Sequence, residues 1–138
     1  MADPRFWQQR MAPTLADIEA LATQAWDRLP SEFRALAQDV VIRVVDFAPD
    51  EVLEDLAIES PYDLMGLYQG VALTQKGVLD PPREPDMIFL YRRALLDFWT
   101  EGEETLGQLV THVLVHEIGH HFGLSDEDME AIEADVRG

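Results

Sequence analysis

The sequence predicts a single α+β domain in which helices and strands surround one central helix. The chain has 138 residues, 47 % of them apolar, and no cysteine. This suits one domain that buries an apolar core without disulfide bonds. Apolar runs with strand character alternate with segments of helical spacing, and one long segment is apolar on nearly every side, which is typical of a buried helix. We expect residues 1–13 to form a flexible leader and residues 14–138 to form the domain.

The first part of the domain has the signals of two helices. Thr14 and Asp17 have the spacing of a capping box. Apolar residues then recur at helical spacing up to Leu29. Pro30 ends this helix because proline cannot continue it. Ser31 begins a short second helix.

Three later segments have the composition of β-strands. They are Val40–Phe47, Leu64–Thr74 and Met87–Tyr91. The first is apolar on nearly both faces, which predicts an interior strand. The second carries glycines, which indicate a bulge or the close approach of a ligand or another backbone. We expect Asp50 to cap a short helix between these two strands and the proline-rich residues 75–86 to form a loop, whereas residues 94–100 are ambiguous.

The C-terminal part predicts the central helix and a last helix. The central helix begins near Glu103, in an acidic stretch that suits a helix N-terminus. It continues to about Phe122, where Gly123 is well placed to end it. Ser125 caps the last helix. The inner stripe of that helix is Met129, Ile132 and Val136.

The charge and the hydropathy exclude several classes of partner. Ten Lys and Arg residues against 27 Asp and Glu residues give a net charge of -17. Such a charge repels phosphate backbones, so we expect no nucleic acid and no anionic membrane as a partner. The N-terminus has no apolar core of signal-peptide length, and no apolar run approaches the roughly 20 residues that cross a bilayer. We therefore expect a cytoplasmic protein. For the oligomeric state, a monomer is the default expectation.

All the histidines of the chain lie in the predicted central helix. They are His112, His116, His120 and His121. His116 and His120 belong to an H-E-x-x-H motif, and imidazoles four residues apart share one helical face, where both can reach one metal ion. Glu117 lies about 100° round the helix from His116. Its carboxylate therefore flanks the ion and can take a proton from a metal-activated water, which predicts a hydrolytic site with Glu117 as the general base.

A catalytic zinc site usually has three protein ligands and a water. Asp126 is the better candidate for the third ligand, because Gly123 permits a turn that brings residue 126 back toward the metal. An acidic residue is also common in a first helical turn, and both roles can hold at once. His112 lies about 12 Å from His120 along the helix axis, so one ion cannot bind all three histidines of that face. We interpret His112 as a packing residue or a partner of a ligand, and His121 as a residue that orients another group or faces solvent.

The run from His116 to Asp126 resembles the zincin metallopeptidases in their H-E-x-x-H-x-x-G-x-x-[H/D] form. Over roughly residues 30–137 the chain resembles the minimal zincin family of small bacterial predicted zinc metallopeptidases. The resemblance rests on Leu64–Thr74, Ile88–Arg93 and Val113–Met129. The chain after Asp126 is too short for the methionine turn of the metzincins. Glu130 or Glu133 could be argued as the distant glutamate of the thermolysin-like group.

This resemblance implies a zincin-like fold, with a small twisted mixed sheet of about three to four strands packed on the active-site helix and flanked by other helices. It implies His116, His120 and Asp126 as the ligands of one Zn²⁺ ion per chain and Glu117 as the general base. We expect a peptide or protein as the substrate. In zincins an edge strand pairs with the extended substrate, and Leu64–Thr74 is the candidate for it.

Three other residues are candidates to stabilise an oxyanion: Tyr68, Tyr91 and Arg92. Each is more often a core or rim residue. Zinc is favoured by two imidazoles and one carboxylate, although iron, manganese or cobalt can occupy the same ligands.

The sequence leaves three alternatives to a zinc metallopeptidase. The first is a metal-binding zincin-like module without intrinsic peptidase activity, which the small size of the chain favours. The second is another metal-dependent hydrolase with the same ligand spacing, such as the ribonucleases that mature ribosomal RNA. Asp126, which is not histidine, and the acidic charge weigh against it. The third is an acidic interaction protein that binds no metal.

Overall fold

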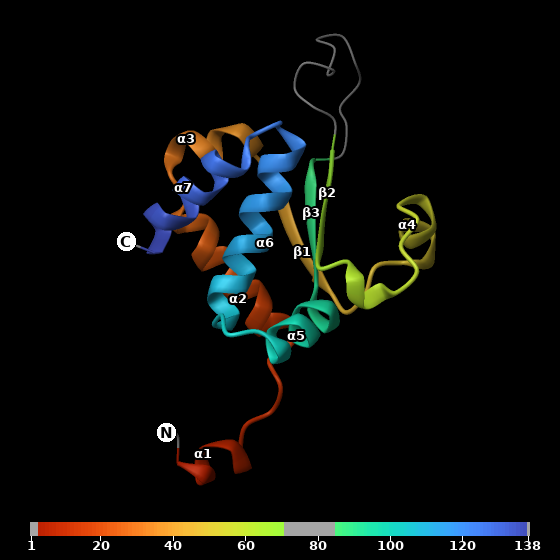
Figure 1. Ribbon diagram of the computed structural model, residues 1–138, viewed down its shortest axis with the longest axis vertical. Helices are drawn as coiled ribbons and strands as arrows, with labels where there is room; N and C mark the ends of the chain where they lie inside the picture. Colours follow the sequence, from red (N-terminus) through yellow and green to blue (C-terminus); the bar gives the residue numbers. More distant parts are fainter. Residues whose placement is uncertain (1–2, 71–84, 138) are drawn as a thin grey trace.

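The computed structural model describes residues 3–70 and 85–137. It confirms the predicted α+β fold (Figure 1). The elements follow in this order: α1 (Pro4–Gln8), α2 (Leu15–Arg28), α3 (Ser31–Arg34), η1 (Ala35–Ala37), β1 (Val41–Val45), α4 (Asp50–Asp55), η2 (Pro61–Asp63), β2 (Gly66–Gln69), β3 (Met87–Tyr91), α5 (Arg92–Glu101), α6 (Leu106–His121) and α7 (Asp126–Arg137), where η marks a 3₁₀ helix. In these two ranges no helix combines the length and the hydropathy that crossing a membrane requires.

The three described strands form a mixed sheet in the order β1-β3-β2. β1 runs parallel to β3, with Val41 opposite Met87, and β2 runs antiparallel to β3, with Gly66 opposite Leu90. The sheet agrees with the expected mixed sheet of three to four strands. The prediction of an interior strand at Val40–Phe47 is wrong, because β1 lies at one end of this order and β3 lies in the middle. One face of β1 is apolar because Ile42 and Val44 pack on the main core, against which α2 also lies, whereas Arg43 and Val45 on the other face are exposed.

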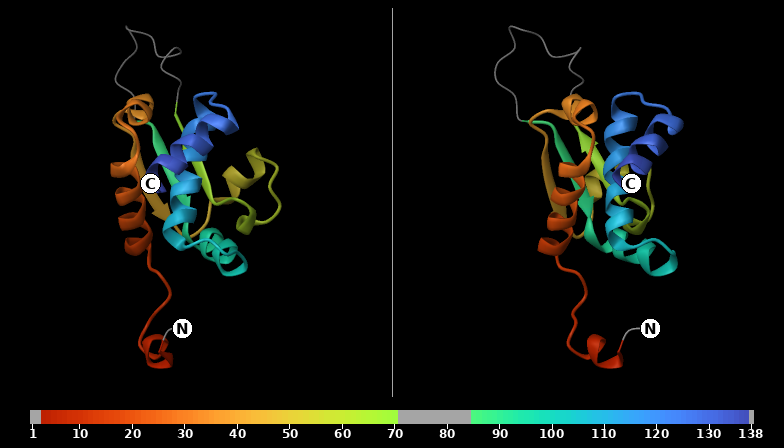
Figure 2. Two further views of the ribbon diagram at one scale, coloured as in Figure 1. Left: turned by 60° about the vertical axis from the view of Figure 1, so that its left-hand side comes forward. Right: turned by 90° about the vertical axis from the view of Figure 1, so that its left-hand side faces the viewer.

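Alternate residues of the sheet face two different layers. Ile88 and Leu90 belong to the main core, which α2 and α6 share on one face of the sheet (Figure 2). Phe89 and Tyr91 face the opposite side, where α4 and η2 lie (Figure 1). α2 and α6 therefore form one layer with the sheet between them and α4. Because neighbours surround α6, its apolar residues are buried on most sides, as predicted.

The central helix begins later than Glu103. Thr105 is its N-cap, because the side chain of Thr105 accepts a hydrogen bond from the N–H of Gln108 at 3.1 Å and the side chain of Gln108 accepts one from the N–H of Thr105 at 3.0 Å. This is a capping box, the same device that Thr14 and Asp17 form at the start of α2. The predicted capping box of α2 is confirmed.

The turn after α6 reverses the chain. Gly123 has a positive φ of 75°, and the N–H of Leu124 donates to the carbonyl of Gly119 at 2.8 Å. The N–H of Gly123 donates to the carbonyl of His120 at 3.2 Å, which completes a Schellman motif. The predicted stop at Gly123 is confirmed. α7 therefore folds back against α6.

Two further contacts set how closely α7 lies on α6. The side chain of Ser125 caps α7, as predicted, by accepting from the N–H of Asp128 at 3.1 Å. Met129, on the predicted inner stripe, is fully buried against the main core. Gly119 makes room for it, since a Cβ at position 119 would lie 2.8 Å from the Cγ of Met129. The two helices thus approach at Gly119.

The remaining expectations were met in part. Pro49, rather than Asp50, precedes α4, and no side chain caps that helix. The ambiguous residues 94–100 lie within α5. β2 is shorter than Leu64–Thr74, and residues 71–84, which include the end of that segment and most of the expected loop, lie outside the described residues. The predicted leader contains the short helix α1, which lies apart from the sheet (Figure 1).

Candidate metal centre

The H-E-x-x-H motif lies in the last half of α6. The rings of His116 and His120 meet edge to face, with their centroids 5.4 Å apart. The Nε2 atom of His116 is buried and has no hydrogen-bond partner among the described residues. His120 is exposed. One motif histidine thus offers an unsatisfied nitrogen inside the protein and the other lies at the surface.

Glu117 lies against β2. A Cβ at Gly66 would lie 3.4 Å from the Cγ of Glu117 and 2.7 Å from the Cγ1 of Val113, so this glycine is what lets α6 approach the strand. Burial raises the pKa of the Glu117 carboxyl, while the backbone N–H of Tyr68 and the imidazole of His120 act in the opposite direction. The general-base candidate is therefore a partly desolvated carboxyl, held beside the strand.

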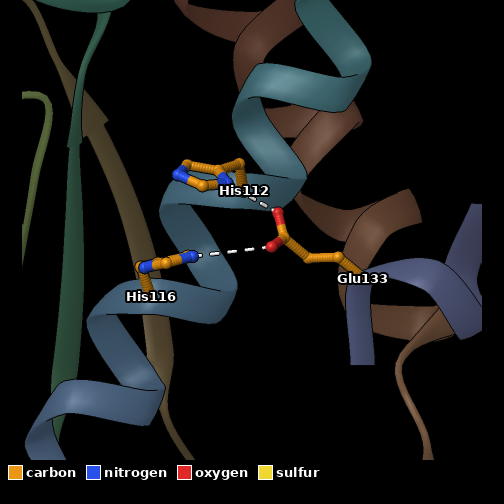
Figure 3. Close-up of side chains that lie close together, drawn as sticks. All are labelled: His112, His116 and Glu133. Atoms are coloured by element: carbon orange, nitrogen blue, oxygen red, sulfur yellow. Dashed lines mark hydrogen bonds and ion pairs between the residues drawn. The ribbon is translucent and has the colours of Figure 1, made fainter. Parts of the chain in front are cut away.

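The structure brings together a group of three other donors at the motif. His112, His116 and Glu133 each offer one ligand atom, and these atoms lie within 4.8 Å of one another. Nδ1 of His112 lies 2.7 Å from Oε1 of Glu133, and Nε2 of His116 lies 3.5 Å from Oε2 of Glu133 (Figure 3). The two histidines come from successive turns of α6, and Glu133 reaches them from α7 (Figure 3).

Only part of this group coincides with the predicted ligands. His116 is in the group, but His120 and Asp126, the other predicted ligands, are not. Asp126 is the exposed first residue of α7. His112 contacts an acidic partner of His116, in line with its interpretation as a partner of a ligand. Glu133 was only one of two arguable glutamates, although its spacing of four residues from the buried Met129 is the signal that places it on the inner face of α7.

The remaining candidate residues have other partners. The hydroxyl of Tyr68 donates to Asp86 at 2.7 Å, and its ring stacks on His121 with the centroids 4.0 Å apart. Tyr91 is buried, and burial together with the charge of Glu117 raises its pKa. Arg92 donates from Nε to the carbonyl of Pro13 and from its guanidinium to Asp46. These contacts hold Arg92 at the junction of the leader and α5.

The donors suit a zinc ion. Imidazole nitrogen and carboxylate oxygen are common zinc ligands, and the chain offers both on α6 and α7. A buried imidazole nitrogen without a partner loses its hydrogen bonds to water and gains none in return. The Nε2 atom of His116 is such an atom, and a metal ion would satisfy it. The residues present therefore fit a metal.

The sequence pattern of the zincin-like metallopeptidases matches residues 37–136. The chain belongs to this family. The match includes the sheet and the two helices α6 and α7, so the zincin-like part of the chain coincides with the elements that position the donors. Because this is a family of metallopeptidases, the chain is assigned at this coarse level to the metal-binding hydrolases. A search of curated proteins finds no match to this zincin-like chain.

Proposed function

We propose that this zincin-like protein is a zinc-dependent peptidase in which Glu117 is the general base. The observation that carries the proposal is the position of Glu117, whose partly desolvated carboxyl lies against β2 and interacts with the imidazole of His120, the second motif histidine. A general base must lie beside the ion without being consumed as its ligand. The turn of about 100° between adjacent helical residues separates these two roles.

Glu117 has the environment of a proton acceptor. Its carboxyl is partly desolvated, which raises its pKa, and a base is most efficient when its pKa approaches the working pH. The N–H of Tyr68 faces the carboxylate and fixes its direction. In the reaction Glu117 would accept a proton from the attacking water and later give it to the leaving amine of the peptide.

The metal ligands of this proposal are His116, His120 and Asp126, for one Zn²⁺ ion per chain. Bound there, zinc would polarise the scissile carbonyl and lower the pKa of a water toward 7. His120 and Asp126 are both exposed, and both lie next to the turn at Gly123. The short loop between α6 and α7 therefore limits how far Asp126 can lie from His120.

The substrate would bind along β2. Among the described residues β2 has one neighbour, β3. The N–H of Tyr91 donates to the carbonyl of Met65, so the alternate residues Gly66 and Tyr68 turn their backbone groups to the opposite side. An extended peptide can pair with the backbone groups of Gly66 and with the carbonyl of Tyr68, since the N–H of Tyr68 faces the Glu117 carboxylate. The charge of -17 favours a substrate with basic residues.

The test is Glu117→Gln, with Glu130→Gln on the exposed side of α7 as the matched control. We expect Glu117→Gln to lower kcat for a peptide library by at least about 10²-fold with zinc content unchanged, because a lost general base costs about 10²–10⁴-fold. Glu130→Gln should leave both unchanged. Zinc bound by the wild type without cleavage of any peptide would overturn the peptidase and leave a metal-binding module. Loss of zinc in Glu117→Gln would make Glu117 a ligand.

A further inference from the structure

The group of His112, His116 and Glu133 lies on the face of α6 that α7 covers (Figure 3). Glu133 is the buried charged residue of this interface, with 6 % of its surface exposed. α7 otherwise carries its acidic residues outward, since Glu127, Glu130 and Asp135 are exposed. A carboxylate buried against apolar neighbours is costly unless its oxygens are satisfied.

The two oxygens of Glu133 have different partners. Oε1 lies 2.7 Å from Nδ1 of His112, which is a hydrogen bond. Oε2 lies 3.5 Å from Nε2 of His116, which is too far for a good hydrogen bond and leaves Nε2 without one. Two ligand atoms about 2.0–2.2 Å from one zinc ion at a tetrahedral angle stand about 3.4 Å apart. The separation of Oε2 and Nε2 is therefore that of two ligands of one ion.

The backbone keeps this separation. The Schellman turn at Gly123 reverses the chain, and Gly119 lets Met129 seat α7 closely on α6. Glu133 follows Met129 by one helical turn, as His116 precedes Gly119 by about one turn. Glu133 on α7 and His116 on α6 therefore face each other across the helix interface.

We propose that His112, His116 and Glu133 form a second site for a transition-metal ion such as Zn²⁺, distinct from the set of His116, His120 and Asp126. On binding, His112 exchanges its hydrogen bond to Oε1 for a bond from Nδ1 to the ion. The inference rests on the proposed function in one respect, that both sets use His116. One Nε2 atom holds one ion, so the two sets are alternative positions of a single ion.

The experiment measures metal affinity in an Asp126→Asn background, where the other set has lost its third ligand. Zn²⁺ affinity is measured by competition with a chelator, and Co²⁺ replaces Zn²⁺ for visible absorption spectra. We expect Asp126→Asn alone to retain about one Zn²⁺ per chain with a four-coordinate Co²⁺ spectrum. Adding Glu133→Gln should weaken Zn²⁺ binding by at least about tenfold and alter that spectrum, since even a residue that only hydrogen-bonds a ligand contributes about 10–100-fold and Glu133 is a ligand itself.

Two further variants make the outcome decisive. Glu130→Gln in the same background is the matched control, because Glu130 is exposed on the same helix, and it should change neither affinity nor spectrum. His112→Asn provides a second route if Glu133→Gln fails to fold, and it should weaken binding in the same way. Urea unfolding in chelator checks that each variant is folded. The proposal is overturned if Asp126→Asn abolishes metal binding, or if Glu133→Gln and His112→Asn leave it unchanged.

These outcomes are independent of peptidase activity. A wild type that binds zinc and cleaves nothing would refute the proposed function, while the affinities in the Asp126→Asn background would still report on Glu133. A different result would refute only the second site. In it the wild type cleaves peptides, while the Asp126→Asn, Glu133→Gln double variant binds Zn²⁺ as tightly as Asp126→Asn alone.

Discussion

The Nε2 atom of His116 lies 3.5 Å from the Oε2 atom of Glu133, across the interface of α6 and α7. The two residues are distant in the sequence, and nothing in their local patterns pairs them. They meet because the turn at Gly123 folds α7 back and Gly119 lets it approach. The chemistry available to His116 therefore depends on the packing of two helices.

Gly119→Ala should separate these helices. The added Cβ would lie 2.8 Å from the Cγ of Met129, and even closer to its sulfur, so the buried Met129 side chain, or α7 with it, must shift. We expect a loss of about 1–3 kcal/mol in the free energy of unfolding, which is the usual cost of overpacking. Urea denaturation measures it. Zn²⁺ affinity in the Asp126→Asn background should fall as well, because Glu133 moves with α7.

Gly107→Ala is the matched control for this prediction, since Gly107 lies in the first turns of the same helix. A Cβ there would meet only the Cδ2 of Leu21 at 3.8 Å, which is an ordinary contact. The change should stabilise the protein by up to about 1 kcal/mol, because alanine is the better helix former. Equal effects of the two substitutions would show that Gly119 is not a packing contact.

Gly66→Ala should disturb the other side of α6. The new Cβ would lie 2.7 Å from the Cγ1 of Val113 and 3.2 Å from the carbonyl of Phe89. We expect β2 to move away from Glu117, with at least about a tenfold fall in kcat/KM and about 1–3 kcal/mol lost in stability. A double-mutant cycle with Val113→Ala should give a coupling energy of about 0.5–3 kcal/mol. Strict additivity would contradict the contact.

Zinc should stabilise the folded protein by mass action. At a free Zn²⁺ concentration of about 100 Kd the gain is about 2.7 kcal/mol, which raises Tm by several degrees, and chelator should reverse it. His116→Ala should abolish the shift because both proposed sets use His116. His121→Ala should retain it, since His121 stacks on Tyr68 and belongs to neither set. A shift that survives His116→Ala would place the ion elsewhere.

The stability of the metal-free protein should depend on pH through Glu117. Its pKa is raised in the folded state by burial, so the folded protein binds this proton more tightly than the unfolded chain. The contribution of Glu117 to the free energy of unfolding is therefore greatest below the ordinary pKa of a glutamate, about 4.3, and falls as the pH rises through the folded value. Glu117→Gln should remove this fall.

The measurement is urea unfolding in chelator from pH 4 to pH 7. The stability of Glu117→Gln relative to the wild type should increase over this range. Parallel curves for the two proteins would mean that the Glu117 carboxyl is not desolvated.

Arg92→Ala tests whether Arg92 acts in catalysis. Its Nε donates to the carbonyl of Pro13 at 2.6 Å, and its guanidinium lies 3.1 Å from Asp46. We expect kcat/KM to stay within about twofold and the free energy of unfolding to fall by about 1 kcal/mol, the usual contribution of a hydrogen bond. A large loss of activity with unchanged stability would instead assign Arg92 to the oxyanion.

Local patterns account for what the sequence predicted correctly. The capping box at Thr14 and the stop at Gly123 depend on residues within one turn of each other, and the structure has both. The capping box at Thr105 has the same kind of spacing. The prediction nevertheless began α6 too early, near Glu103, because it relied on the acidic stretch before Thr105. The position of β1 at the end of the sheet depends on which strands pair, and the apolar pattern of β1 alone does not determine that pairing.

The sequence by itself determined the helix that carries His116, Glu117 and His120, because a spacing of four residues and a buried apolar pattern suffice to build that face. Whether Asp126 completes a zinc site with the two histidines is still a prediction. Only the tertiary structure decided that Glu133 meets His112 and His116. The physical reason is that periodicity sets which face of a helix a side chain occupies, whereas the partner across that face is set by the close packing of α7 on Gly119.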